Sequence, residues 1–423
     1  MSPNAVRRIH ACLISRASAV LIWKTNRIPK SPAVAKYPMN RRDFISSTAA
    51  ALAASSVAPT NLFAADSKSD GANYAPQGKP NAVVKPGEFI IAAAHLDHGH
   101  INGMCNGLTE AGATLKWVFE PDEKKAASFH EKFPQTKIAR SLDEILSDPE
   151  VHLVASAAVT SERGPLGCRV MLAGKDYFSD KAPFTTLEQL QQAKAVVART
   201  GRKHMVYYGE RLHNESAMYA TDLVQQGAIG RVIQVTCLAP HRLNASSRPA
   251  WFFQREKFGG ILCDIGSHQF EQFLTYTGAT DATVTNALIG NFANPNYPEF
   301  EDYGEASLIG NTGASNFVRV DWYTPNGLPT WGDGRTFILG TKGFIELRKY
   351  LDLARETTAN HVYIADEKGV RHIPVDGKVG YRFFGEFILD CLHRTEKAMT
   401  QAHAFKSAEL ALLAQNAARR LNT

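Results

Sequence analysis

The residues best suited to acid–base chemistry lie in two separate segments of the chain. Lys181 follows the apolar run at 177–178, where a strand is expected to end. Asp264 and His268 lie four residues apart, where a helix is expected to begin. Residues at that spacing share one helix face, so the imidazole can exchange a proton while the carboxylate orients it or binds a hydroxyl. Each residue alone also has a structural interpretation: a solvated lysine, or a capping Asp followed by a buried His.

A second group of polar side chains follows the first expected strand. Residues 95–100 hold three histidines, one Asp and Gly99, and they open a helix, which is where dinucleotide-binding folds hold a pyrophosphate. With Gly99 as the last glycine of G-x-G-x-x-G, Ala94 and Leu96 occupy the first two glycine positions, so the motif is weak. A metal site is the alternative, but the histidines share one tight turn and no distant ligand set accompanies them. The five cysteines after residue 65 form no CxxC pair, so we expect neither a metal nor a disulfide framework.

The ends of the expected strands predict the remaining cofactor contacts. Glu120 ends the second strand, about 20 residues after the loop, where a carboxylate accepts ribose hydroxyls. This position favours NAD, with NADP the less expected cofactor. The expected cofactor contacts are Asp97, His98, Gly99, His100, Glu120, Ser156, Ala157, Asp180 and Lys181.

The elements that position these residues alternate between strands and helices in the first half of the chain. Apolar runs typical of buried parallel strands lie at 89–94, 115–119, 153–157, 177–178 and 205–208. Helical patterns lie at 101–111, 123–133, 141–146, 165–173 and 187–200. This alternation predicts an α/β fold with a doubly wound parallel Rossmann sheet.

The second half of the chain has a different pattern. Strand patterns lie at 232–238, 283–289, 306–309, 316–323, 336–339 and 344–347, and helical patterns at 381–393 and 403–421 end the chain. Strands without long helices between them predict an α+β domain with a mostly antiparallel sheet. We therefore divide the chain into a leader at 1–65, a linker at 66–86, an NAD-binding domain at 87–208 and a substrate-binding and oligomerisation domain at 209–423.

The leader holds the excess positive charge of the chain. Residues 1–64 contain nine Lys or Arg and one Asp, a net of +8 against +6 for the whole chain, so the remainder carries −2. That balance gives no reason to expect nucleic acid as a partner. Arg41 and Arg42, followed by an Ala- and Ser-rich run, resemble a twin-arginine export signal. The run is too short to span a bilayer, so we expect a periplasmic or exported protein without a stable membrane anchor.

The order of the motifs resembles the Gfo/Idh/MocA oxidoreductases, which include glucose-fructose oxidoreductase and inositol dehydrogenase. The motifs are Lys181-Ala182-Pro183, Tyr208-Gly209-Glu210-Arg211-Leu212, Gly227-Ala228-Ile229-Gly230, and Gly-Gly-x-x-x-Asp-x-Gly-x-His at 259–268. The resemblance covers about 85–420 and implies a tightly held nicotinamide nucleotide and a sheet domain that binds a sugar or cyclitol. It also implies that Lys181, Asp264 and His268 are catalytic. The family's Glu before the lysine is Asp180 here, and its proline is displaced by Ala182.

The expected activity is NAD-dependent oxidation of a sugar or cyclitol hydroxyl. His268 would take the hydroxyl proton, Lys181 would polarise the oxygen, and Asp264 would position His268 or a hydroxyl. The expected substrate contacts are Arg211, His241 and Trp251, and a homo-oligomer through the C-terminal sheet is expected. Two alternatives remain: a redox-neutral glycoside hydrolase or lyase working through a transient keto sugar, and a sugar-binding protein whose Rossmann scaffold no longer binds nucleotide.

Overall fold

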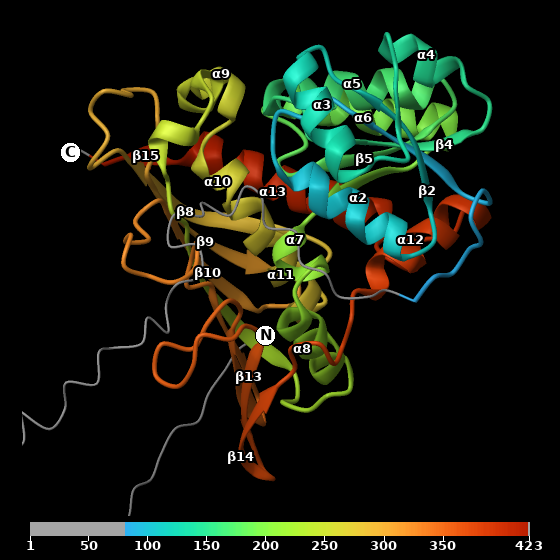
Figure 1. Ribbon diagram of the computed structural model, residues 1–423. Helices are drawn as coiled ribbons and strands as arrows, with labels where there is room; N and C mark the ends of the chain where they lie inside the picture. The colour runs from blue at the N-terminus through green and yellow to red at the C-terminus, as the bar shows by residue number, and fades with distance from the viewer. Residues whose placement is uncertain (1–80, 422–423) are drawn as a thin grey trace, which may run out of the picture. The chain divides into compact units, whose positions relative to one another are not determined.

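The structure is a computed structural model that describes residues 81–421 (Figure 1). The segment that resembles an export signal lies outside the described residues. Within 81–421, no helix is both long and apolar enough to cross a membrane. The five cysteines of this range are all free thiols.

The first domain contains a six-stranded parallel sheet in the order β3-β2-β1-β4-β5-β6. Its strands are β1 (Ile90–Ala94), β2 (Thr114–Phe119), β3 (Lys137–Ile138), β4 (Val151–Ser156), β5 (Asp176–Asp180) and β6 (His204–Tyr207). Its helices are α2 (His100–Glu110), α3 (Glu123–Lys132), α4 (Leu142–Ser147), α5 (Thr160–Leu172) and α6 (Leu187–Thr200). Strand order reverses between β1 and β4, and sheets of this class bind ligands outside the carboxyl ends at such a point.

Helices cover both faces of this sheet because β1 is apolar on both sides. Ile91 and Ala93 belong to one hydrophobic cluster, whereas Ala92 and Ala94 belong to another. Successive side chains of a strand point to opposite faces, so this division places one cluster on each face of the sheet. The predicted doubly wound sheet is confirmed.

Helix α12 (Arg382–His393), near the end of the chain, returns to the first domain and lies beside α2 (Figure 1). Its Phe387 ring lies 5.2 Å from the ring of Phe178 in β5. Phe384 packs against Gly107 of α2, where a Cβ atom would overlap the ring. The core of the first domain therefore includes a segment that the sequence division assigned to the second.

The second domain contains a nine-stranded sheet in the order β14-β13-β12-β11-β7-β10-β9-β8-β15. The strands are β7 (Val232–Pro240), β8 (Ala282–Gly290), β9 (Tyr303–Gly310), β10 (Ser315–Asp321), β11 (Arg335–Gly340), β12 (Gly343–Arg348), β13 (His361–Asp366), β14 (Gly369–Pro374) and β15 (Arg419–Arg420). Only the β7–β10 and β8–β15 pairs of this described sheet are parallel. The predicted, mostly antiparallel sheet is confirmed.

The second domain also contains short and long helices. They are α7 (Gly209–Leu212), α8 (Glu215–Gln225), the 3-10 turns η1 (Ala245–Ser247) and η2 (Ala250–Phe253), α9 (Arg255–Phe258), α10 (Ile261–Asp264), α11 (Gly266–Thr277) and α13 (Gln401–Ala417). Helix α11 is buried from Gly266 through Leu274 and packs on β7. Gly259 and Gly260 have φ of 89° and 94°, a conformation that favours glycine, and they turn the chain into α10.

Several element boundaries differ from the predicted ones. Helix α5 begins at Thr160, not at Pro165. Pro165 has no N–H for the carbonyl of Ser161, and that carbonyl accepts instead from Gln189 Nε2 at 2.9 Å. The final helix ends at Ala417, and the next residues pair with β8 as β15. Strands β13 and β14 were not predicted.

Candidate active site

A cavity is lined by residues of both domains. The first domain contributes residues from the loop before α2 and from the ends of β5 and β6, and the second contributes residues from α7, α10, α11 and the segments that flank its strands. The lining residues are His98, His100, Lys181, Tyr207, Gly209, Glu210, His241, Arg248, Asp264, His268, Trp322, Trp331 and Tyr350. The cavity thus brings together Lys181, Asp264 and His268, which the sequence predicted as catalytic.

Lys181 and Asp264 form a buried ion pair in this cavity. Lys181 Nζ donates a hydrogen bond to Asp264 Oδ1 at 2.6 Å, and the two residues are only 4% and 7% exposed. Burial alone would raise the pKa of Asp264, but the charge and hydrogen bond of Lys181 outweigh it and lower that pKa. Asp264 is therefore ionised and holds the ammonium group of Lys181, rather than orienting His268.

His268 lies on the first turn of α11 and is 2% exposed. Its Nδ1 atom has no hydrogen-bond partner among the described residues. Burial lowers the pKa of His268 well below its usual value, and the positive charge of Lys181 lowers it further. The imidazole is therefore neutral at pH 7, and an unpartnered buried nitrogen in a cavity is a site where a ligand can bind.

A second polar cluster surrounds Glu210. Its Oε2 accepts from Lys349 Nζ at 3.0 Å, and its Oε1 accepts from Gln269 Nε2 at 3.1 Å. His241 Nε2 lies 3.7 Å from Oε1, and burial lowers the pKa of His241 to about 4.

Aromatic rings form another wall of the cavity. The Trp331 ring lies 4.6 Å from the His241 ring and 4.2 Å from the Tyr350 ring, and Trp322 lies 5.5 Å from His241. Rings with an apolar face and a polar edge suit a ligand with both apolar and hydroxyl surfaces.

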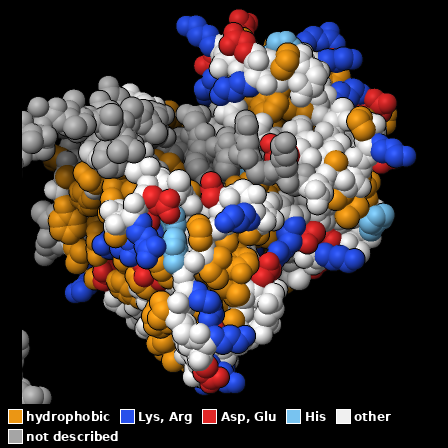
Figure 2. Space-filling model, turned by 60° about the horizontal axis from the view of Figure 1, so that its bottom comes forward, with side chains coloured by type: hydrophobic (Ala, Val, Ile, Leu, Met, Phe, Trp, Pro, Cys, Tyr) orange, Lys and Arg blue, Asp and Glu red, His pale blue; other side chains and the backbone are white. Residues whose placement is uncertain are grey.

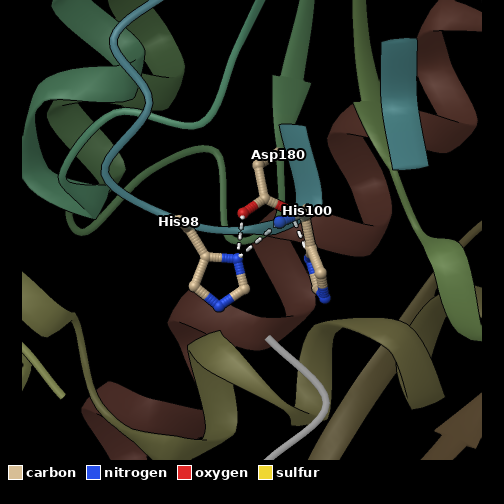
Figure 3. Close-up of side chains that lie close together, drawn as sticks. All are labelled: His98, His100 and Asp180. Atoms are coloured by element: carbon tan, nitrogen blue, oxygen red, sulfur yellow. Dashed lines mark hydrogen bonds and ion pairs between the residues drawn. The ribbon is translucent and has the colours of Figure 1, made fainter. Parts of the chain in front are cut away.

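Asp180, at the end of β5, lies between the rings of His98 and His100 (Figure 3). His98 Nδ1 is 3.1 Å from Oδ2 and His100 Nδ1 is 2.8 Å from Oδ1. Arg163 Nη2 lies 3.1 Å from Oδ2, and Arg163 also donates to the carbonyl of Lys181. Burial would raise the pKa of Asp180, but these neighbours hold it well below its usual value. Asp180 is thus ionised, and its partners are the side chains of His98, His100 and Arg163.

The residues at the crevice outside the carboxyl ends of the first sheet could hold a dinucleotide. Glu120 Oε2 accepts from the Leu96 N–H at 2.6 Å and Oε1 from the Asp122 N–H at 3.0 Å. A carboxylate has about four lone-pair sites, so Glu120 keeps acceptors for ribose hydroxyls. The N-cap residue of helix α2 is Gly99, which offers no side-chain cap, and the His100 and Ile101 N–H groups donate to His98 Nδ1 at 3.4 Å and to the His98 carbonyl at 3.3 Å. Leu96 packs against the hydrophobic cluster of the first domain.

The other expected cofactor contacts lie around the same loop. The His98 N–H donates to the Ala157 carbonyl at 3.0 Å, and the Ala157 N–H donates to the His95 carbonyl at 3.1 Å. Ser156 precedes Ala157 at the end of β4, and Asp97 pairs with Lys125 at 2.7 Å. These contacts hold the loop against β4, at the crevice where a pyrophosphate would lie.

Two expected substrate contacts lie outside the cavity. Arg211 Nε donates to Glu271 at 2.8 Å and lines a different cavity, because consecutive residues of α7 point about 100° apart and Glu210 takes the inward position. Trp251 packs edge-on against Phe252. His241 does line the cavity.

Seven lining residues were not predicted as site residues: Tyr207, Gly209, Glu210, Arg248, Trp322, Trp331 and Tyr350. Only Gly209 and Glu210 had a signal, since both lie in the motif at 208–212.

Comparison with known proteins identifies the family. The model "Oxidoreductase family, NAD-binding Rossmann fold" matches residues 93–208, and the model "GFO/IDH/MocA C-terminal domain" matches 218–346. A solved structure of an oxidoreductase from Erwinia carotovora atroseptica SCRI1043 is 47% identical, with a TM-score of 0.77, and covers 79% of this chain and 100% of its own.

Two curated relatives carry the names of activities. D-xylose dehydrogenase of Paenarthrobacter nicotinovorans is 28% identical over 35% of this chain and 39% of its own length. scyllo-Inositol 2-dehydrogenase (NAD(+)) of Bacillus subtilis (strain 168) is 24% identical over 66% of this chain and 77% of its own. Together with the two family models, the fold and the Lys181, Asp264 and His268 arrangement show that this chain belongs to the Gfo/Idh/MocA family of oxidoreductases, with an NAD-binding Rossmann domain.

Proposed function

We propose that this chain catalyses the NAD-dependent oxidation of a hydroxyl group on a sugar or cyclitol. One observation carries the proposal: the Lys181–Asp264 ion pair and His268, whose Nδ1 atom has no partner among the described residues, line one cavity. The names of the xylose and inositol dehydrogenases support the substrate class.

The residues of the chain divide the proton chemistry between them. The neutral imidazole of His268 accepts the proton of the substrate hydroxyl. The ammonium group of Lys181 stabilises the negative charge that develops on that oxygen, and Asp264 holds the ammonium group in place. Bound NAD supplies the hydride acceptor. Burial of all three side chains excludes water from the reacting oxygen.

The test is a substrate panel assayed on the full chain. D-xylose, D-glucose, myo-inositol and scyllo-inositol are each added with NAD, and the absorbance of reduced nicotinamide is followed through the first turnover and the steady state. We expect at least one polyol to reduce the cofactor. A protein that reduces no cofactor with any of them would contradict the proposal.

We also propose a homo-oligomer through the open face of the second sheet. Cross-strand register places Phe344, Leu339, Gln234, Ser315 and Ile309 in one row across five strands. Leu339, Phe344 and Ile309 are 41%, 48% and 51% exposed. Figure 2 shows hydrophobic side chains gathered in several places on the face that it presents. Exposed apolar rows of this kind mark association surfaces.

We further propose export by the twin-arginine route to the periplasm. The support is the leader sequence alone, in which Arg41 and Arg42 precede an Ala- and Ser-rich run.

A further inference from the structure

The ionised carboxylate of Asp180 orients the ring of His100. An anionic carboxylate only accepts hydrogen bonds, so His100 Nδ1, which lies 2.8 Å from Asp180 Oδ1, carries a proton. When this ring is neutral, its lone pair lies on Nε2. His98 Nδ1 lies 3.1 Å from Asp180 Oδ2 but accepts from the His100 N–H at 3.4 Å, so Asp180 does not set the tautomer of His98.

The Nε2 atoms point away from Asp180 (Figure 3). Both rings line the cavity that holds Lys181 and His268. The rings are nearly perpendicular, at 86°, with centroids 4.3 Å apart. The cavity therefore contains one acceptor, His100 Nε2, at the start of α2.

The charges around the cavity favour a neutral hydrogen-bond donor over a metal ion. The three atoms His98 Nδ1, His100 Nδ1 and an Asp180 oxygen lie within 4.8 Å of one another, a spacing that a metal ion could bridge. However, Arg163 already faces Asp180 and Lys181 already faces Asp264, each in a close ion pair. A divalent cation would add a buried charge of +2, and both carboxylates already have a cationic partner.

We propose that His100 is a substrate-binding residue whose Nε2 atom accepts a hydrogen bond from a hydroxyl group of the polyol, with Asp180 as the positioning residue for its ring. The inference rests on the proposed function and adds a specificity determinant to it. A polyol lacking that hydroxyl would leave the acceptor unpaired and bind more weakly.

Two substitutions of His100 separate the roles of its two nitrogen atoms. His100→Asn keeps a donor near Nδ1 for Asp180 but removes the acceptor at Nε2. His100→Gln places an amide oxygen near Nε2 but removes the Nδ1 donor. The measurement is the dissociation constant of D-xylose and of scyllo-inositol on the full chain loaded with NADH, which cannot accept a hydride. His393→Ala, an exposed position on α12, is the matched control.

We expect His100→Asn to weaken polyol binding by about 10-fold or more, the loss that one unpaired buried acceptor causes. His100→Gln should bind more tightly than His100→Asn, and His393→Ala should equal wild type. Equal binding by wild type and His100→Asn would overturn the inference. So would one transition-metal ion per chain in the purified protein that both His100 variants lose. A wild type that reduces no cofactor with the panel would instead contradict the proposed function, so the two failures are distinguishable.

Discussion

At the scale of single residues, the proposed reaction assigns the proton transfer to His268 and the stabilisation of the alkoxide to Lys181. Replacing His268 by Asn removes the proton acceptor, and replacing Lys181 by Met removes the charge beside the developing alkoxide and leaves Asp264 unpaired. Each should lower kcat by about 10²-fold or more. Lys368→Met, an exposed lysine, is the control. Unchanged turnover in either variant, with a wild-type circular dichroism spectrum, would remove that residue from the mechanism.

His204 is a buried histidine that the proposed mechanism does not use. It is fully buried against Tyr177, Phe184 and Phe405, and neither ring nitrogen has a partner among the described residues. Burial lowers its pKa from 6.5 to about 4. The unfolded chain therefore binds this proton first as the pH falls, so His204 causes a loss of stability between about pH 6.5 and pH 4.

His204→Leu should remove this part of the pH dependence. Relative to pH 8, the variant should lose about 2 kcal/mol less unfolding free energy at pH 5 than wild type does. The measurement is urea unfolding at both pH values, with His393→Leu as the control. Parallel losses in His204→Leu and wild type would show that this ring is protonated at a similar pH in the folded and unfolded chain.

The grouping of the three proposed catalytic residues could be predicted from the sequence, whereas much of the cavity wall could not. Lys181, Asp264 and His268 lie in motifs with fixed spacing, and the fold brings them together. Trp331 and Tyr350 belong to irregular segments around the second sheet, and no local pattern distinguishes a lining tryptophan from a core one.

At the scale of elements, the close packing of α2 on α12 joins the end of the chain to the first domain. Gly107 permits this approach, because a Cβ atom there would overlap the Phe384 ring. Gly107→Ala should destabilise the protein by about 1–3 kcal/mol, the usual range for overpacking, although alanine favours helix. Phe384→Leu in the same chain should recover part of the loss. A Gly107→Ala variant more stable than wild type would show that α12 can move away from α2 without a loss of stability.

Helices and buried strands of the first domain could be predicted well because each depends on local pattern. Helix α6 has the predicted bounds, with Thr186 as its N-cap and Gly201 at φ 64° as its C-cap. Strand β15 could not be predicted, since Arg419 and Arg420 have no strand pattern and are held by pairing with β8. Tertiary contacts determine the secondary structure of such short segments.

At the scale of the whole molecule, the open face of the second sheet should decide the oligomeric state. Leu339 and Phe344 lie directly opposite each other in the exposed row. Leu339→Glu would place a charge in the centre of the proposed interface, where it would lose its hydration on association. Light scattering after gel filtration should show a smaller assembly than wild type. Leu172→Glu, on α5 of the first domain and also exposed, should leave the mass unchanged. If Leu339→Glu and wild type had the same mass, this face would be excluded as the oligomer interface.

The proposed export and the proposed redox activity together predict that the cofactor stays bound. The twin-arginine route carries folded proteins, so NAD can be inserted before the chain leaves the cytoplasm. Free nicotinamide nucleotide is not expected outside the cytoplasm, so an enzyme that released NADH there would stop after one turnover. A retained cofactor requires the hydride to return to a sugar within the same cavity.

We therefore expect about one NAD per chain in the purified protein, released only on denaturation and measured by chromatography. Turnover should need no added nucleotide when an oxidised sugar is present as hydride acceptor. Glu120→Ala should purify with less nucleotide, because it removes the ribose acceptor and the contact that holds the Leu96 N–H. A wild type isolated without nucleotide, whose steady-state rate saturates with external NAD, would show that the cofactor exchanges freely. That outcome would place the working enzyme where NAD is available and would contradict the proposed export.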